Sequence, residues 1–270
     1  MNSLAKNIAQ AIDDFNGIRA AIEEKGTAIG NVPTSAYAEK ILSLDTQQVF
    51  YTTSGVPYPQ HLEFPDTMTK LTAWSGCTEL LSVKLPEHLE DVDVASCFAN
   101  CTKLESAVLP KSVDGLRLGT RFFQYCKALK NVELPLGIIG LSTNDFDGCT
   151  SLESLTIPNE GNFTYISTYV FKNCTSLKTI NIPASVTLMQ DSAFYNCTNL
   201  EHVTLEQGYC KSLNLSASNK FSADTIVAMF NALADLTGSD AQTLNLGAEN
   251  LAKVTEEQKQ IATNKNWNLA

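Results

Sequence analysis

Residues 146–158 read FDGCTSLESLTIP, and residues 171–183 read FKNCTSLKTINIP, so the same frame returns after 25 positions. Each stretch begins with an aromatic residue, has Cys three residues later and Leu three residues after the Cys, and ends at a Pro. Between the Leu and the Pro, apolar and polar residues alternate, which is typical of a short strand with one buried face. The two stretches therefore indicate a repeated strand unit.

Six copies of this frame follow one another along the chain. Their cysteines are separated by 24, 25, 23, 25 and 23 residues and are Cys77, Cys101, Cys126, Cys149, Cys174 and Cys197. The aromatic residues are Trp74, Phe98, Phe123, Phe146, Phe171 and Phe194, and the leucines are Leu80, Leu104, Leu129, Leu152, Leu177 and Leu200. Such regular recurrence identifies a repeat architecture.

A single unit of this size cannot bury its apolar side, but stacked units share a continuous core. We therefore predict a parallel sheet of about ten short strands, spaced about 4.8 Å apart. The distance from aromatic to Cys and from Cys to Pro is constant, whereas 11 to 13 residues separate each Pro from the next aromatic. This variable arc is expected on the convex side, because a stacked sheet tolerates no slip of register.

The repeat resembles the BspA-type leucine-rich repeat family of bacterial proteins. Residues 191–198, DSAFYNCT, give the closest copy, and the resemblance covers roughly residues 59–206. It implies a leucine-rich-repeat solenoid with a parallel β-sheet. Members of that family are mostly cell-surface or secreted proteins that bind host proteins or other cells. The resemblance therefore implies adhesion or protein binding at a bacterial surface.

Residues 207–270 change their period. Strand-like and helix-like segments alternate as strand–helix–strand–helix–strand, with Ser222 capping the first helix and a Thr255–Gln258 capping box opening the second. We predict helix-backed repeats that continue the solenoid as a C-terminal cap. This segment also resembles a C-terminal module of repeat proteins in gut bacteria and their prophages.

The N-terminal segment, residues 1–45, is expected to be helical. Its first helix has an apolar stripe made of Leu4, Ile8, Ile12, Phe15, Ile18 and Ile22. The segment is similar to the start of many phage tail and structural proteins. The stripe predicts self-association or docking through residues 4–22; alternatively, residues 29–44 fold back as a helical hairpin and bury it.

Charge and hydropathy exclude some classes of partner. The chain carries 19 basic and 29 acidic residues, a net charge of −10, which argues against nucleic acid or an anionic membrane as partner. No apolar run is long enough to cross a bilayer, so no membrane insertion is expected. The opening MNSLAKNIAQAIDD is too polar for a signal peptide, and the localisation is left open between cell surface, virion and cytoplasm.

No catalytic, cofactor or metal signature is present, so the sequence does not predict an enzyme. His61, His88 and His202 have no second ligand at metal-binding spacing. One Cys per coil forms a column and not a tetrahedral site, which favours buried thiols over disulfides or a metal. The Asn-Cys-Thr triplets at residues 100, 173 and 196 match glycosylation sequons, but their position in the repeat predicts core turns.

The concave face of the sheet is the candidate binding face. Its outward residues are small, polar and almost uncharged, and the candidates are His61, Glu63, Lys84, Asn131, Glu133, Asn181 and His202. The alternative is a solvated sheet without a ligand, since the face has no aromatic anchor. Exposed aromatic residues are expected in the arcs and the linker instead, at Tyr51, Tyr58, Phe163, Tyr165 and Tyr169.

Two functions remain compatible with this pattern. The first is a non-enzymatic binding, adhesion or structural module displayed on a bacterial cell surface or a phage tail. The second is an intracellular scaffold for protein–protein interactions. The missing signal peptide favours this scaffold or the phage version of the first function. The ligand itself is not encoded in any recognisable motif.

Overall fold

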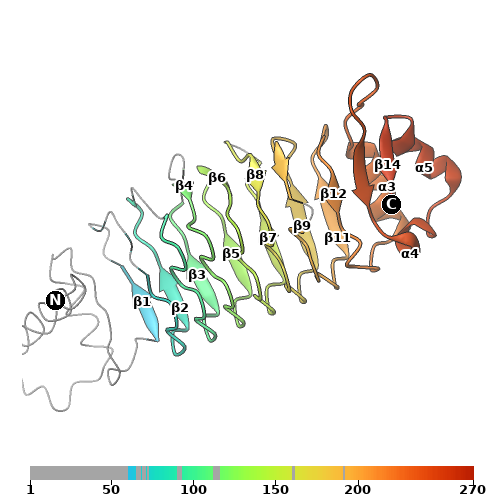
Figure 1. The fold of residues 1–270 in the computed structure, drawn as a ribbon. Helices are drawn as coiled ribbons and strands as arrows, with labels where there is room; N and C mark the ends of the chain where they lie inside the picture. Colours follow the sequence, from blue (N-terminus) through green and yellow to red (C-terminus); the bar gives the residue numbers. More distant parts are fainter. Residues whose placement is uncertain are drawn as a thin grey trace, which may run out of the picture.

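The computed structural model describes residues 60–64, 68, 71, 73–89, 93–111, 116–159, 162–190 and 192–270. Within these residues, strand-bearing coils come first and the helices come last (Figure 1). The predicted N-terminal helical segment, with its association stripe from Leu4 to Ile22, lies outside the described residues. No helix in the described part of the chain has the length and apolar character needed to span a membrane.

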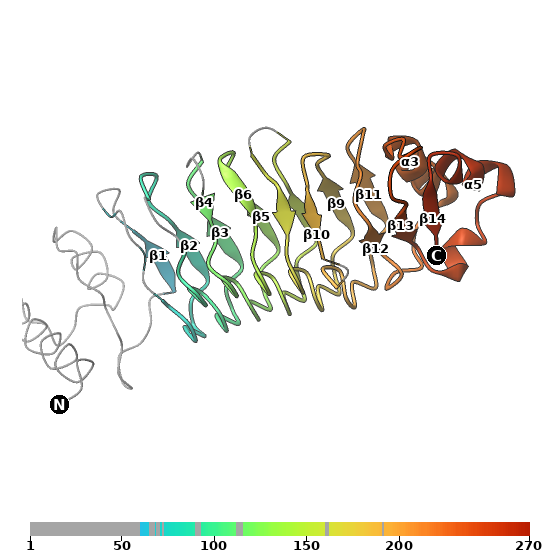
Figure 2. The ribbon, with the colours of Figure 1, turned by 45° about the horizontal axis from the view of Figure 1, so that its top comes forward.

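Seven short strands form one parallel sheet along the stack (Figures 1 and 2). In order across the sheet they are β1 (His61–Glu63), β2 (Ser82–Lys84), β3 (Ser106–Val108), β5 (Asn131–Glu133), β7 (Ser154–Thr156), β9 (Thr179–Ile182) and β11 (His202–Leu205). Each coil contributes one strand in the register of the repeat, so that Ser154 pairs with Asn131 on one side and Thr179 on the other. The predicted solenoid is confirmed.

The strands alternate between buried and outward positions, as the sequence predicts. In β7 the central Leu155 is buried, whereas Thr156 is exposed. Leu152 and Ile157, on either side of this strand, are fully buried. Pro158 follows directly, at the point where its missing N–H removes no ladder bond. The short period-two run thus positions one inward residue per strand.

The variable arcs carry a second parallel sheet, where the sequence analysis predicts length variation but no strands. Its four strands are β4 (Leu116–Arg117), β6 (Ile138–Leu141), β8 (Tyr165–Ile166) and β10 (Leu188–Met189), in the order β10-β8-β6-β4. Gly140 pairs with Tyr165, and the Tyr165 ring fills the space that a side chain at Gly140 would need. The arcs are therefore paired segments of the coil.

The core is built from columns that run along the stack. Neighbouring rings of one column stack with centroids 5.2 to 5.9 Å apart and interplanar angles of 12° to 27°. The stacked rings are those of Phe98, Phe123, Phe146, Phe171 and Phe194. The predicted leucine and cysteine columns are buried beside them. Each coil from Phe98 to Phe194 thus contributes the same three side chains to one continuous core, whereas the first coil has Trp74 in the aromatic position, packed edge-on against Phe64.

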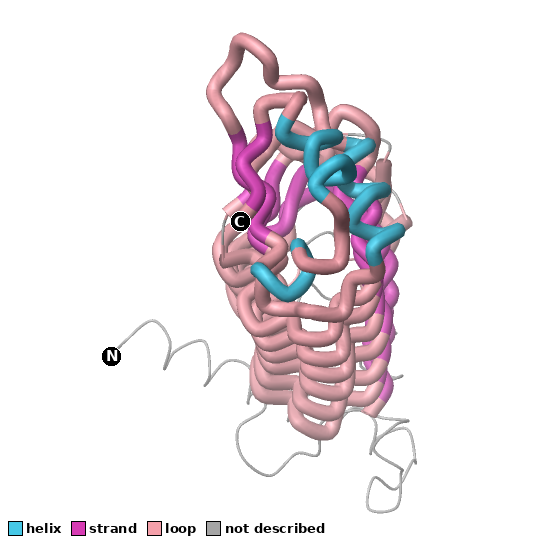
Figure 3. Tube along the Cα trace, turned by 90° about the vertical axis from the view of Figure 1, so that its right-hand side faces the viewer, coloured by secondary structure: helices cyan, strands magenta, loops and turns pink. Residues whose placement is uncertain are grey.

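The C-terminal part alternates strands and helices. Its elements are β12 (Leu213–Asn214), α3 (Ala223–Ala232), β13 (Gln242–Asn245), α4 (Ala248–Leu251), α5 (Glu256–Thr263) and β14 (Trp267–Leu269). Ser222 caps α3 by accepting the Thr225 N–H at 3.1 Å, and Thr255 and Gln258 form the predicted capping box of α5. In Figure 3 the turns of successive coils lie over one another, and the helices lie at the C-terminal end of the stack.

The prediction of a single sheet of about ten strands is wrong. The three C-terminal strands pair with one another in the order β12-β13-β14 and form a separate parallel sheet. The physical reason is that α3 packs against β11, the last strand of the seven-stranded sheet. A helix is too wide to continue a ladder whose strands lie about 4.8 Å apart.

Candidate functional site

The outward side of the seven-stranded sheet, called the sheet face below, brings all seven predicted site residues onto one surface. One column contains His61, Ser82, Ser106, Asn131, Ser154, Thr179 and His202. The neighbouring column contains Glu63, Lys84, Val108, Glu133, Thr156, Asn181 and Thr204. The columns are those expected from the repeat, and most of their side chains are exposed or half-buried.

Neighbours on the sheet face interact mainly with each other. The His61 Nδ1 lies 2.7 Å from the Ser82 Oγ, and the Lys84 ammonium forms an ion pair with Glu63. Both members of that ion pair are well exposed, so solvent screens it. His202 lies at the other end of the column from His61, six strands away. The two histidines therefore cannot act together.

Asn181 has a role inside the sheet. Its Oδ1 accepts the Ile157 N–H at 2.9 Å, and its Nδ2 donates to the Ile157 carbonyl oxygen at 2.7 Å. The same Nδ2 also donates to the Asn159 Oδ1 at 3.0 Å. These bonds continue the ladder beyond Thr156, where β7 ends. This side chain holds neighbouring coils together.

A charged column beside the sheet escaped the sequence analysis. It occupies the position four residues after the cysteine and contains Glu105, Lys130, Glu153, Lys178 and Glu201. The Lys130 Nζ lies 3.7 Å from a carboxylate oxygen of Glu105. Because the sign of the charge alternates from coil to coil, neighbouring charges in the column largely offset one another. The column therefore produces no strong electrostatic potential that would favour a charged partner. The repeat spacing alone was sufficient to find it.

The turns that carry the cysteines form another long surface, called the turn edge below. The residue before each column cysteine has a positive φ, between 60° and 78°, and these residues are Gly76, Asn100, Tyr125, Gly148, Asn173 and Asn196. Gly and Asn adopt this conformation most readily, which explains the Asn-Cys-Thr triplets. The triplets are turns as predicted, but their assignment to the core is wrong, because the turn directs the Asn100 and Asn196 side chains outward.

Two exposed tyrosines meet on the turn edge. Tyr195, with 60% of its surface exposed, contacts Tyr169, which is 37% exposed, in a T-shaped pair with 6.4 Å between ring centroids. The Lys172 ammonium lies over the Tyr169 ring, 4.8 Å from its centroid. Tyr125, in an earlier coil, instead lays its ring over Gly148. Tyr169 and Tyr195, called the tyrosine pair below, are therefore two exposed aromatic side chains in direct contact on the turn edge.

The predicted exposed aromatics are confirmed only in part. Tyr169 is exposed as expected, and Tyr51 and Tyr58 lie outside the described residues. Phe163 is 1% exposed, so its prediction is wrong, because the arc pairs into the second sheet and draws this ring inward. Tyr195 escaped the sequence analysis, although its position next to the aromatic column was a usable signal.

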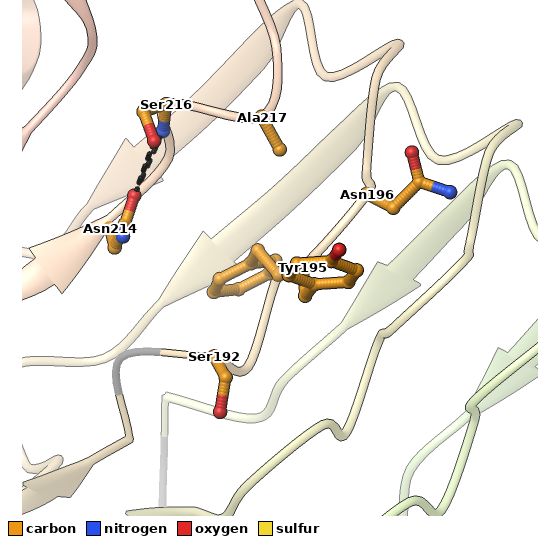
Figure 4. Close-up of a pocket in the computed structure, with 7 residues that line it drawn as sticks. Ser192, Tyr195, Asn196, Asn214, Ser216 and Ala217 are labelled. Atoms are coloured by element: carbon orange, nitrogen blue, oxygen red, sulfur yellow. Dashed lines mark hydrogen bonds between the residues drawn. The ribbon is translucent and has the colours of Figure 1, made fainter.

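An open pocket lies between the last repeat coil and β12, next to the tyrosine pair (Figure 4). Its volume is about 480 Å³, and it is lined by Ser192, Phe194, Tyr195, Asn196, Asn214, Ser216 and Ala217. In Figure 4 the Tyr195 ring lies among Ser192, Asn196 and Ala217, and the Asn214–Ser216 bond marks the adjoining strand segment. The pocket combines an aromatic wall with hydroxyl and amide groups.

The cysteine column is a structural feature. All eight cysteines are free thiols, and each column cysteine from Cys77 to Cys197 is buried. The Cys149 Sγ lies 3.1 Å from the Phe123 carbonyl oxygen of the preceding coil, and the same geometry recurs in later coils. Burial raises the pKa of Cys197 to about 12, which keeps the thiol protonated. Within the described ranges, no cluster of His, Cys, Asp or Glu could hold a metal ion.

The family model for the BspA type leucine rich repeat region matches residues 47–117 and 94–226, with six copies. The chain belongs to the BspA-type leucine-rich repeat family. This membership accounts for the coils, the arcs and the cysteine column together. This match does not test the resemblance of the N-terminal and C-terminal segments to phage and prophage proteins, which stays a prediction.

Two leucine-rich repeat proteins of known structure are similar to this chain. The T. pallidum Leucine Rich Repeat protein is 21% identical with a TM-score of 0.54, over 61% of this chain and 79% of that one. A leucine-rich repeat protein from Bacteroides ovatus is 23% identical with a TM-score of 0.40, over 77% of this chain and 59% of that one. The first of these likenesses supports the fold. No curated protein matches the chain.

Asp145, one of two buried aspartates in the described part of this BspA-type chain, is bonded to main chain. Asp145 is fully buried, and its oxygens accept N–H groups of Ser142 at 2.6 Å and Phe122 at 3.4 Å. Burial raises the pKa of Asp145 well above its usual range, although both N–H groups act in the opposite direction. This carboxyl shapes a turn beneath the surface and is not accessible to a substrate.

Proposed function

We propose that this chain is a non-enzymatic binding module that mediates adhesion from a bacterial cell surface or a phage tail. The observation that carries the proposal is the tyrosine pair, whose rings are exposed on the turn edge beside the Lys172 ammonium. Tyrosine is enriched among the residues that dominate the energy of protein interfaces. It offers a large apolar area with few rotatable bonds and a polar tip.

The coils beneath the tyrosine pair support binding because they hold it rigidly. The rings of Phe171 and Phe194, which lie in the same turns as Tyr169 and Tyr195, stack with 5.2 Å between their centroids. The Asn173 N–H donates to the Tyr195 carbonyl oxygen at 2.9 Å, which fixes one turn against the next. A preordered surface loses little conformational entropy when a partner binds. The sheet face offers no comparable anchor, because Val108 is its exposed apolar side chain among small polar ones.

Display on a bacterial surface is proposed because the chain belongs to the BspA-type family. Binding of the fluorescently labelled full chain to intact bacterial and epithelial cells, measured by flow cytometry, tests the adhesive function. We expect saturable binding to the cells. The double variant Tyr169→Ala/Tyr195→Ala should bind with an affinity that is at least tenfold lower. Asn131→Ala/Glu133→Ala on the sheet face should bind like the wild type. Loss of binding in the sheet-face variant alone would reject the tyrosine pair as the anchor, and no saturable binding to any cell would reject adhesion.

An intracellular protein–protein scaffold is the second candidate, and the eight free thiols favour it. Reduced cysteines persist in the cytosol, whereas exported proteins often carry disulfides. Immunodetection in the cytosolic, cell-wall and purified phage fractions separates the alternatives. Recovery in the cell wall or the virion supports display, whereas recovery in the cytosol alone supports the scaffold.

A further inference from the structure

The described side chains that line the pocket beside the tyrosine pair are all uncharged. Each of its described lining side chains is a Ser, Asn, Ala, Phe or Tyr, although the chain as a whole carries a net charge of −10. These neutral lining side chains give no advantage to an anionic or cationic ligand. Its volume of about 480 Å³ lies within the range of about 300–1,000 Å³ that is usual for small-molecule sites.

The hydrogen bonds inside the pocket orient its two amides. The Asn214 Oδ1 accepts both the Ser216 N–H, at 3.1 Å, and the Ser216 hydroxyl, at 2.8 Å. The Asn214 NH2 group is therefore left to donate to a ligand. The Asn196 Nδ2 donates to the Asn173 Oδ1 at 3.0 Å, so that the Asn196 Oδ1 is left to accept. The pocket thus offers a donor and an acceptor on its two sides.

We infer that this pocket binds a neutral saccharide, an inference that rests on the proposed binding function and names its ligand class. Each sugar hydroxyl donates and accepts at once, which matches the donor of Asn214 and the acceptor of Asn196. The C–H face of a pyranose ring provides the apolar surface that the exposed Tyr195 ring can cover. A peptide added as a strand fits less well, because β12 has two residues and Asn214 already occupies the Ser216 N–H.

Binding of the purified full chain to immobilised glycans tests this inference. The panel contains neutral glycans (mannan, galactan, β-glucan and N-acetylglucosamine oligomers) and two acidic ones, hyaluronan and heparin, with biolayer interferometry as the readout. We expect saturable binding to at least one neutral glycan, with no gain from acidic groups. Tyr195→Ala and Asn214→Asp should each weaken that binding at least tenfold, the second because it replaces the NH2 donor by an acceptor.

The next coil provides a matched control. Asn245 pairs with Asn214 across β12 and β13, and its Oδ1 accepts the Gly247 N–H at 3.1 Å in an equivalent turn outside the pocket. Asn245→Asp adds the same charge and should leave glycan binding unchanged, as should Tyr125→Ala. Equal weakening by Asn245→Asp and Asn214→Asp would overturn the assignment of the site.

The remaining outcomes separate this inference from the proposed function. Binding to cells without binding to any neutral glycan of the panel overturns the saccharide assignment but leaves adhesion standing. Cell binding that is abolished by protease treatment of the cells but unaffected by glycosidases would indicate a protein partner. That result too would overturn the saccharide assignment and leave adhesion standing. Preference for hyaluronan or heparin overturns the assignment of a neutral ligand. If the chain binds neither cells nor glycans, both proposals fail.

Discussion

The thiol of Cys174 donates a hydrogen bond to the carbonyl oxygen of Phe146 in the preceding coil, with 3.1 Å between Sγ and O. The same oxygen accepts the Cys149 N–H of its own turn at 3.0 Å. The aromatic carbonyls from Trp74 to Phe171 each link their own turn to the next coil in this way. The Cys that recurs in every copy of the frame combines small apolar bulk with a weak donor, a combination that neither Ala nor Val provides.

We predict that Cys174→Ala lowers the free energy of unfolding by about 1–2 kcal/mol, because it leaves a small cavity and removes the S–H donor. Cys210 lies outside the column and is only partly buried, so Cys210→Ala serves as the control and should change stability by less than about 0.5 kcal/mol. Urea denaturation of the full chain measures both. Equal effects of the two substitutions would show that the column position has no special role.

The stacked aromatic column predicts a larger effect. Phe171 is fully buried between Phe146 and Phe194, so Phe171→Ala should destabilise the protein by about 3–5 kcal/mol. Tyr125→Ala, which removes a ring that is 39% exposed from the same turns, should cost less than about 1 kcal/mol. A loss below 1 kcal/mol for Phe171→Ala in the same urea titration would contradict the stacked core.

The repeat spacing was sufficient to predict the coils, the buried columns and the outward columns of the sheet. It worked because the aromatic, Cys and Leu positions of the frame recur six times and a one-residue slip would expose the core. The second sheet escaped prediction because β4, β8 and β10 have only two residues each and lie where the lengths vary.

The candidate site was less predictable from sequence. Tyr169 and Tyr195 occupy different positions of the frame, so no column links them, and their contact depends on the way one turn lies over the next. The sheet face was located correctly, but the outward position of Asn181 in the repeat does not predict its hydrogen bonds to the main chain of Ile157. The separate C-terminal sheet depends on the packing of α3 against β11, which helix periodicity does not specify.

The buried carboxyl of Asp145 predicts a pH-dependent stability. Its pKa is raised well above the usual range by burial, whereas in the unfolded chain it ionises near pH 4. As the pH rises from the pKa of Asp145 in the unfolded chain towards its higher pKa in the folded chain, the unfolded state loses its proton first. The contribution of Asp145 to the free energy of unfolding therefore falls with increasing pH. The urea midpoint of the wild type should therefore fall, relative to that of Asp145→Asn, between pH 4 and pH 8. A constant difference between the two proteins over this range would show that Asp145 does not titrate differently on folding.

Lys265 predicts a stability effect at the end of α3. Its ammonium donates to the carbonyl oxygens of Phe230, Asn231 and Leu233 at 3.1, 2.9 and 2.8 Å. Lys265→Met removes these charge-assisted bonds from helix-terminal carbonyls and should cost about 1–3 kcal/mol by thermal or urea unfolding. Lys259→Met, which breaks an exposed pair with Glu256, should cost less than about 0.5 kcal/mol. Similar costs for both would contradict the capping role.

The most direct test of the account is the protection of individual tyrosines when the unmodified full chain binds intact cells. Nitration by tetranitromethane, followed by mass spectrometry, compares the free chain with the cell-bound chain at single residues. Tyr195 is 60% exposed and Tyr125 is 39% exposed, so both should be nitrated in the free chain. The account predicts that binding protects Tyr195 and Tyr169 at least fivefold and leaves Tyr125 unprotected. Equal nitration of Tyr195 in the free and the bound chain would contradict the claim that the tyrosine pair is the binding surface.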